Sequence, residues 1–123
     1  MQLSTKSRYA LRMLAELAMH GRQGPVTRAQ LAVAQDISPD YMAQLFRQLQ
    51  AAGLVHSVKG PGGGYELARD AAEITAGDIV RAVEGPIALA PCDECDSPCA
   101  RVEGCIARLV WQDAAAALAR RLD

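Results

Sequence analysis

The stretch SPDYMAQLFRQLQAAGLVHSVKGPGGGY, residues 38–65, decides the fold. Ser38 followed by Pro39 is typical of a helix start, because a serine side chain caps the first free amides and proline suits the first helical position. Gly53 favours a left-handed end to the same helix, which we place over residues 39–52. Apolar residues recur in it at i, i+3, i+4 and i+7, and this face is expected in a core. The face consists of Met42, Leu45, Phe46 and Leu49.

The opposite side of this helix lacks the Glu/Lys pairs typical of a solvated helix. It carries Tyr41, Gln44, Arg47 and Gln48 instead. Such side chains can hydrogen-bond base edges and phosphates, so this side is a candidate for reading the major groove of DNA. Ordinary solvated polarity is the alternative.

A hairpin follows directly, with strands expected over residues 54–59 and 65–68 and the turn GPGGG at 60–64. A hairpin in this place is the wing of a winged helix. Glycine lets the backbone pass close to DNA, and Lys59 beside the turn suits the narrow, negative minor groove. A nucleotide-phosphate loop is the rival interpretation, but it requires a Lys-Ser/Thr pair and a following helix, both missing here.

Upstream, a capping box over residues 27–30 opens a helix that runs to residue 35, with Leu31 and Ala34 expected to face inward. A tight turn at residues 36–37 joins it to the next helix, which makes a helix-turn-helix. Residues 7–20 form an earlier amphipathic helix.

Downstream, Thr75 caps a helix over residues 76–83, and a last helix is expected over residues 105–122. The last helix is apolar on more than one side, and a small domain can bury only one such face. We therefore expect a homodimer, which also suits two DNA half-sites. A helix lying only on its own domain is the alternative. The residues assigned to dimerisation are Leu109, Trp111, Ala115, Leu118 and Leu122.

Composition limits the function classes. The 123 residues suit one domain, and no apolar run approaches the ~20 residues that cross a membrane. The N-terminus does not resemble a secretory signal, so we expect a cytoplasmic protein. Residues 1–62 carry seven Lys/Arg and three Asp/Glu, net +4, whereas residues 63–123 carry six and eleven, net −5. The basic half is the one suited to phosphates, unless the asymmetry is only a dipolar surface.

All four cysteines lie within fourteen residues, spaced C-x2-C-x3-C-x5-C: Cys92, Cys95, Cys99 and Cys105. In a reducing compartment such clusters indicate metal or redox chemistry. The spacing differs from a zinc ribbon and from a two-cluster ferredoxin. An iron–sulfur cluster is favoured, while structural zinc, a metal-free thiol switch and an inert segment stay open.

The chain resembles the Rrf-two (Rrf2) family of winged-helix regulators, which includes the IscR, NsrR and RirA types. The resemblance rests on the opening MQLSTKSRYALRML, on residues 38–65 and on the cysteines at 92, 99 and 105, and it covers nearly the whole chain. It implies a homodimeric transcription factor, with no enzymatic activity, whose DNA affinity depends on an iron–sulfur cluster. A cluster-free thiol-redox or zinc-stabilised repressor is the alternative, because some family members lack clusters.

The resemblance also implies ligands. Cys92, Cys99 and Cys105 match the family's three cysteine ligands. IscR types place a histidine three residues after the last cysteine, where this chain has Arg108, and the carboxylate used by NsrR types corresponds to Arg8. Neither arginine can ligate. We therefore propose Cys95 as the fourth ligand. All-cysteine coordination is compatible with both 2Fe–2S and 4Fe–4S clusters, and of the two we prefer 4Fe–4S.

These predictions divide the chain into a DNA-binding winged helix-turn-helix over residues 1–86, a cluster-binding loop over 87–105 and a dimerisation helix over 106–123. The expected partners are a second copy and a palindromic double-stranded operator. An enzyme is the alternative from a different class, but no Ser/His/Asp or Cys/His arrangement supports it. An electron carrier would need neither the wing nor the helix-turn-helix. The predicted DNA-contacting residues are Arg8, Arg28, Ser38, Tyr41, Gln44, Arg47 and Lys59.

Overall fold

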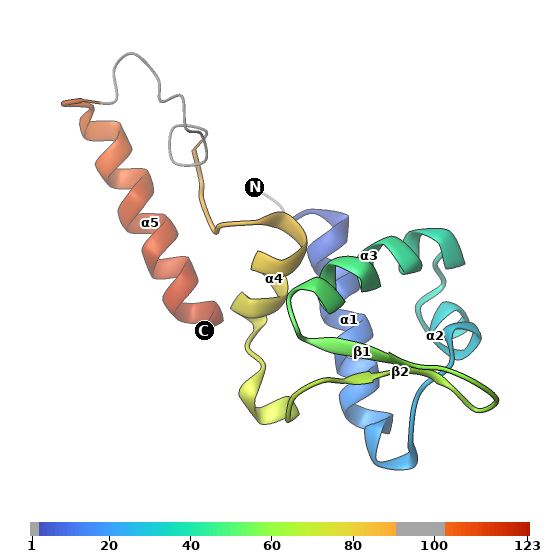
Figure 1. Cartoon of the computed structure of the whole chain (residues 1–123). Helices are drawn as coiled ribbons and strands as arrows, with labels where there is room; N and C mark the ends of the chain where they lie inside the picture. The colour runs from blue at the N-terminus through green and yellow to red at the C-terminus, as the bar shows by residue number, and fades with distance from the viewer. Residues whose placement is uncertain (1–2, 91–102) are drawn as a thin grey trace.

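The computed structural model describes residues 3–90 and 103–123, and the order of its elements confirms a mainly α fold with a β-hairpin wing (Figure 1). The chain runs through α1 (Thr5–His20), a 3-10 turn η1 (Gly21–Gln23), α2 (Arg28–Gln35), α3 (Pro39–Ala51), β1 (Val55–Val58), β2 (Gly64–Leu67), η2 (Ala71–Glu73), α4 (Ala76–Glu84) and α5 (Ile106–Leu122).

The helices begin at the caps that the sequence predicts. Thr27 and Gln30 form a reciprocal capping box at α2: the Gln30 amide donates to Thr27 Oγ1 at 3.1 Å, and the Thr27 amide donates to Gln30 Oε1 at 2.9 Å. Ser38 Oγ accepts from the Tyr41 amide at 3.2 Å, with Pro39 in the first helical position of α3. Each cap satisfies amides that would otherwise lack partners, so the helix starts are set locally.

Helix α3 places its apolar face at the centre of the core, as predicted, with Met42, Leu45, Phe46 and Leu49 buried. In α2 the prediction was half right, because Leu31 is buried but Ala34 is exposed. The inward face of α2 is the side shared by Leu31 and Gln35, one helical turn apart, with Ala32 partly packed against the core. Ala34 lies on the other flank.

The wing is joined to the segment before α2 by an isolated β-bridge that the sequence pattern did not predict. β1 and β2 pair antiparallel, and Val26, just before α2, bridges to Tyr65 through two backbone hydrogen bonds of 2.9 Å. Gly64 makes this bridge possible, because a Cβ there would lie 2.2 Å from the carbonyl oxygen of Val26. Gly62, with φ of 74°, turns the hairpin.

Helix α4 packs against both α1 and α3, and α5 meets α4 at its C-terminal end and extends away from the rest of the fold (Figure 1). The predicted bounds of the last helix differ by one residue, since Cys105 is its N-cap rather than its first residue. Within residues 3–90 and 103–123, no helix is long and apolar enough to cross a membrane.

Candidate nucleic-acid interface and cysteine segment

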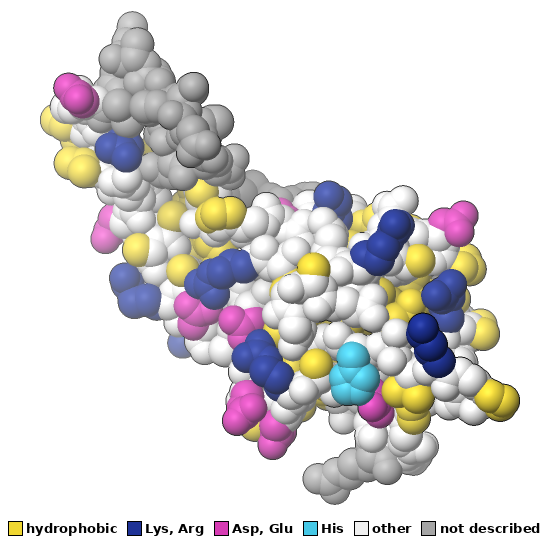
Figure 2. All heavy atoms as spheres, viewed as in Figure 1, with side chains coloured by type: hydrophobic (Ala, Val, Ile, Leu, Met, Phe, Trp, Pro, Cys, Tyr) yellow, Lys and Arg dark blue, Asp and Glu magenta, His cyan; other side chains and the backbone are white. Residues whose placement is uncertain are grey.

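The outer side of α3 carries the polar residues predicted to read DNA. Gln44 and Arg47 are exposed, and Tyr41 is half-buried. Figure 2 shows Lys and Arg side chains over the part of the surface that carries α2, α3 and the hairpin, where few acidic side chains interrupt them. This part of the surface has the charge that a phosphate backbone attracts.

Tyr41 is held in place by an aromatic neighbour. Its ring meets the Tyr9 ring of α1 edge to face, with centroids 6.0 Å apart and an interplanar angle of 80°. The Arg12 guanidinium lies 5.5 Å from the centroid of Tyr9. Tyr41 is therefore also a packing residue, with only part of its surface open to a ligand, which its sequence position did not indicate.

Arg28 is tied to the wing. Its guanidinium donates to the Tyr65 hydroxyl at 3.1 Å and lies 5.9 Å from the Tyr65 ring centroid. The Tyr65 ring in turn stacks on Phe46 of α3, with centroids 3.8 Å apart and 2° between the planes. This stack joins α2, the wing and α3, so it fixes their relative positions. Sequence reasoning missed Tyr65, whose place at the inward-facing position of a wing strand was the available signal.

The other predicted DNA contacts lie at separate places on the described surface. Ser38 is exposed at the start of α3, Lys59 is exposed after β1, and Arg8 is exposed on α1. An open hollow of about 470 Å³ lies between the start of α1, α3 and the end of α4. It is lined by Ser4, Thr5, Lys6, Tyr41, Val83 and Glu84.

Glu84 of α4 holds the start of α1. Its Oε1 accepts hydrogen bonds from the hydroxyls of Ser4 and Ser7. Burial alone would raise the pKa of Glu84, but these hydrogen bonds outweigh it and lower the pKa below the ordinary value of 4.5. The first turn of α1 is thus fastened to α4 through Ser7, the residue just before Arg8.

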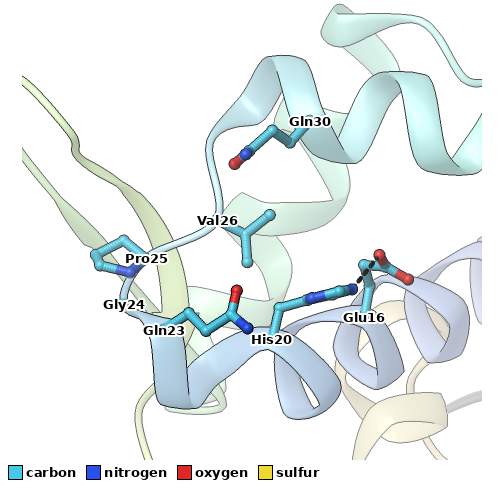
Figure 3. A pocket seen from close by; sticks show the side chains of 7 residues that line it. All are labelled: Glu16, His20, Gln23, Gly24, Pro25, Val26 and Gln30. Atoms are coloured by element: carbon cyan, nitrogen blue, oxygen red, sulfur yellow. Dashed lines mark ion pairs between the residues drawn. The ribbon is translucent and has the colours of Figure 1, made fainter.

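A second cavity, of about 240 Å³, lies where the chain passes from the end of α1 through η1 to the start of α2 (Figure 3). Glu16 and His20 form an ion pair across one turn of α1, at 2.9 Å, and Gln23, Val26 and Gln30 also line the cavity. None of the predicted site residues takes part.

The cysteine segment, residues 92–105, is described only at its end. The predictions for Cys92, Cys95 and Cys99 lie outside the described residues. Cys105 is half-buried and is the N-cap of α5, where its side chain makes no capping hydrogen bond. A ligand at Cys105 would therefore be joined directly to the first turn of α5.

The side chains of α5 differ widely in exposure in the single chain. Ala115 is 7% exposed, and Leu118 and Leu122, on the same stripe as Trp111, are half-buried. Ala115 is thus buried already in the single chain, and its assignment to dimerisation stays a prediction. The large apolar residues with high exposure are Ile106 at 77%, Leu109 at 62%, Val110 at 55% and Trp111 at 48%.

A helix-turn-helix with a wing, a basic surface and a polar outer side on α3 defines the class of winged-helix DNA-binding proteins. The chain belongs to the Rrf2 family: the family model, described as an iron-dependent transcriptional regulator, matches residues 3–123. It is therefore a transcriptional regulator, not an enzyme, and α3 occupies the place of the recognition helix in a helix-turn-helix.

Three relatives illustrate the match. The protein rrf2 of Nitratidesulfovibrio vulgaris is 43% identical over 123 residues, all of this chain and 82% of that protein. The transcriptional regulator IscR of Serratia proteamaculans is 39% identical over 113 residues, 92% of this chain and 68% of that one. Among solved structures, CymR, the global cysteine regulator of B. subtilis, superposes with a TM-score of 0.82 at 36% identity and covers all of this chain and 90% of its own.

Proposed function

We propose that this regulator is a homodimeric repressor whose DNA affinity is controlled by an iron–sulfur cluster on Cys92, Cys95, Cys99 and Cys105. The proposal is carried by one observation: all four cysteines lie in one segment of the chain. The matching family model is described as an iron-dependent transcriptional regulator, which supports the proposal. The signal is iron, redox state or nitric oxide, to each of which such clusters respond.

The donor set fits a cluster. Four thiols are the ligand type that iron–sulfur clusters use. Cys105 makes no capping hydrogen bond, so its sulfur is not engaged by the helix start. Arg108, one turn into α5, is not a ligand. When bound, the cluster supplies a reversible change of charge and ligation in this segment.

DNA recognition is assigned to the winged-helix body, residues 3–90, with proposed contacts from α1, α2, α3 and the wing. Ser38, Tyr41, Gln44 and Arg47 of the recognition helix contact the major groove, where arginine and glutamine can bond base edges in pairs. The remaining proposed contacts are Lys59 in the minor groove and Arg8 and Arg28 at phosphates. Since Arg28 is already bonded to Tyr65, a phosphate it holds would be set relative to the wing.

The exposed apolar face of α5 is the proposed dimer contact. Ile106, Leu109 and Val110 lie on one side of the first turns of α5 and Trp111 lies on another, and all four are exposed in the single chain. Apolar side chains gathered this way mark an interaction surface. A dimer would set the spacing of the two recognition helices on a palindromic operator.

The proposed switch joins these parts. The four cysteines would hold the cluster next to the first turn of α5, because Cys105 is the N-cap of that helix. Gain or loss of the cluster would then change the position of α5 and with it the separation of the two recognition helices, so DNA affinity would change.

Anaerobic reconstitution with iron and sulfide tests the proposal. The protein should acquire a visible charge-transfer band with stoichiometric iron, four irons for the preferred 4Fe–4S form, and its affinity for operator DNA should differ between cluster-bound and apo forms. Cys95→Ser should weaken the cluster and alter its spectrum. An unchanged spectrum and stability in Cys95→Ser would remove Cys95 from the ligand set.

A cluster-free thiol switch, or a zinc-stabilised repressor, is the second candidate. The similarity to CymR, which is a global cysteine regulator, supports it. A colourless protein that binds operator DNA, with affinity that depends on a thiol oxidant or on zinc, would favour this candidate.

A further inference from the structure

Asp123, the C-cap residue of α5, is fastened to α4 by a two-point ion pair. Arg81 donates from Nη1 to Asp123 Oδ1 at 2.8 Å and from Nη2 to Oδ2 at 2.9 Å. Parallel bonds of this kind fix orientation as well as distance. The hydrogen bonds with Asp123 raise the pKa of Arg81, and those from Arg81 lower the pKa of Asp123, so both groups stay charged across the physiological range.

Helix α4 has a matching recess for this carboxylate. A Cβ at Gly77 would lie 2.0 Å from Asp123 Oδ1 and 2.9 Å from Arg81 Nη1, so glycine leaves the space that the pair occupies. Arg81 and Gly77 are one turn apart on α4 and face the same neighbour. The end of α5 is therefore placed by a steric and an electrostatic contact together.

This contact matters because α4 is the element of the described body against which α5 packs most. Among residues 103–123, Ala115 is the one buried residue. The start of α5 is joined to Cys105, and its end is joined to Arg81. A displacement of α5 caused at Cys105 would thus reach the body largely through α4.

Helix α4 connects onward to both DNA-contacting helices. Ile79 and Val83 lie in the core that also holds the recognition helix. Glu84, almost one turn beyond Arg81, holds Ser4 and Ser7 at the start of α1, close to Arg8. The same short helix therefore contacts α5, α1 and α3.

We propose that Arg81 and Asp123 are positioning residues that transmit the state of the cysteine segment through α4 to the recognition helix and the start of α1. The inference rests on the proposed cluster control of DNA affinity. Neither residue is assigned to the cluster or to DNA. Exposed ion pairs add little to stability, so the pair is expected to govern coupling rather than folding.

The test compares DNA affinity in the two cluster states of the full chain. Operator Kd is measured for apo and reconstituted protein, and their ratio reports the coupling, which is typically ~5–150-fold in regulated proteins. Arg81→Gln and Asp123→Asn should each bring the ratio to within about twofold of one. Iron content and the melting temperature of the apo protein should stay as in the unaltered chain.

A double variant and a control separate the pair from a general charge effect. Arg81→Gln with Asp123→Asn should be no more impaired than either single change, since both remove one interaction. Arg121→Gln removes a positive charge from the same turn of α5 and should keep the original ratio.

Three outcomes overturn the inference: unchanged ratios in the single variants, additive losses in the double variant, or loss of the cluster itself when the pair is broken. Failure of the proposed function is distinct, because then the unaltered chain itself would take up no cluster or show a ratio of one.

Discussion

The winged-helix body and α5 differ in how far their large apolar side chains are exposed to solvent. In the body, Phe46, Leu31 and Met13 are fully buried in one continuous core. In α5, four large apolar residues are about half exposed or more, and Ala115 is the buried residue of the helix. Both segments are helical, so helix formation alone does not distinguish them.

The difference indicates two sources of stability. The body is closed by its own contacts, including the Tyr65 stack on Phe46 and the Val26 bridge to Tyr65. Among the described residues, helix α5 exposes large apolar side chains, which supports the proposed dimer contact. Its contact with its own chain is marked instead by the polar pair of Arg81 and Asp123.

The comparison is tested most strongly in the core. Phe46→Ala should lower the free energy of unfolding by ~3–5 kcal/mol, because it leaves a cavity and removes the support of Tyr65. Urea denaturation followed by circular dichroism measures this. Gln44→Ala, exposed on the same helix, should change the free energy by less than ~0.5 kcal/mol. Similar losses for both would mean that the body is not closed by this core.

The wing bridge comes next. Gly64→Ala should cost ~1–3 kcal/mol of unfolding free energy, since its methyl group would press on the backbone of Val26. Gly21→Ala is the matched control, because a Cβ there meets nothing within 4 Å and its φ is −61°. Equal stability of the two variants would show that the wing is free of the body.

For α5 the expected effect is on association rather than on folding. Trp111→Ala should raise the dimer dissociation constant about tenfold, ~1.4 kcal/mol, while the circular dichroism spectrum stays unchanged. Sedimentation equilibrium measures it, with Arg120→Ala, also exposed on α5, as control. A monomeric unaltered chain, or no change in Trp111→Ala, would refute an apolar dimer contact.

The smallest effect concerns the pH dependence of the α1–α4 link. Because the folded pKa of Glu84 is lowered, its stabilising contribution is present above the ordinary value of 4.5 and is lost as pH falls through the lowered value. The difference in unfolding free energy between the unaltered chain and Glu84→Gln should therefore be constant near neutral pH and shrink below 4.5. A pH-independent difference would argue against the hydrogen bonds from Ser4 and Ser7.

Much of the fold could be predicted because its signals are local. Helix caps at Thr27, Ser38 and Thr75 act within three residues, and the buried face of α3 repeats within one or two turns. The error at Ala34 arose where the signal was short: α2 has eight residues, too few for periodicity to fix the inward direction. The candidate DNA residues on α3 share a side for the same local reason.

The sequence by itself determined the secondary structure, the buried face of the recognition helix and the gathering of the four cysteines. Only the tertiary structure decided which residues join the elements: Arg28 with Tyr65, Glu84 with Ser4 and Ser7, and Arg81 with Asp123. These partners are 37, 80, 77 and 42 residues apart. Local patterns repeat over two to four residues and carry no information about such partners, which are chosen only when the whole chain has packed.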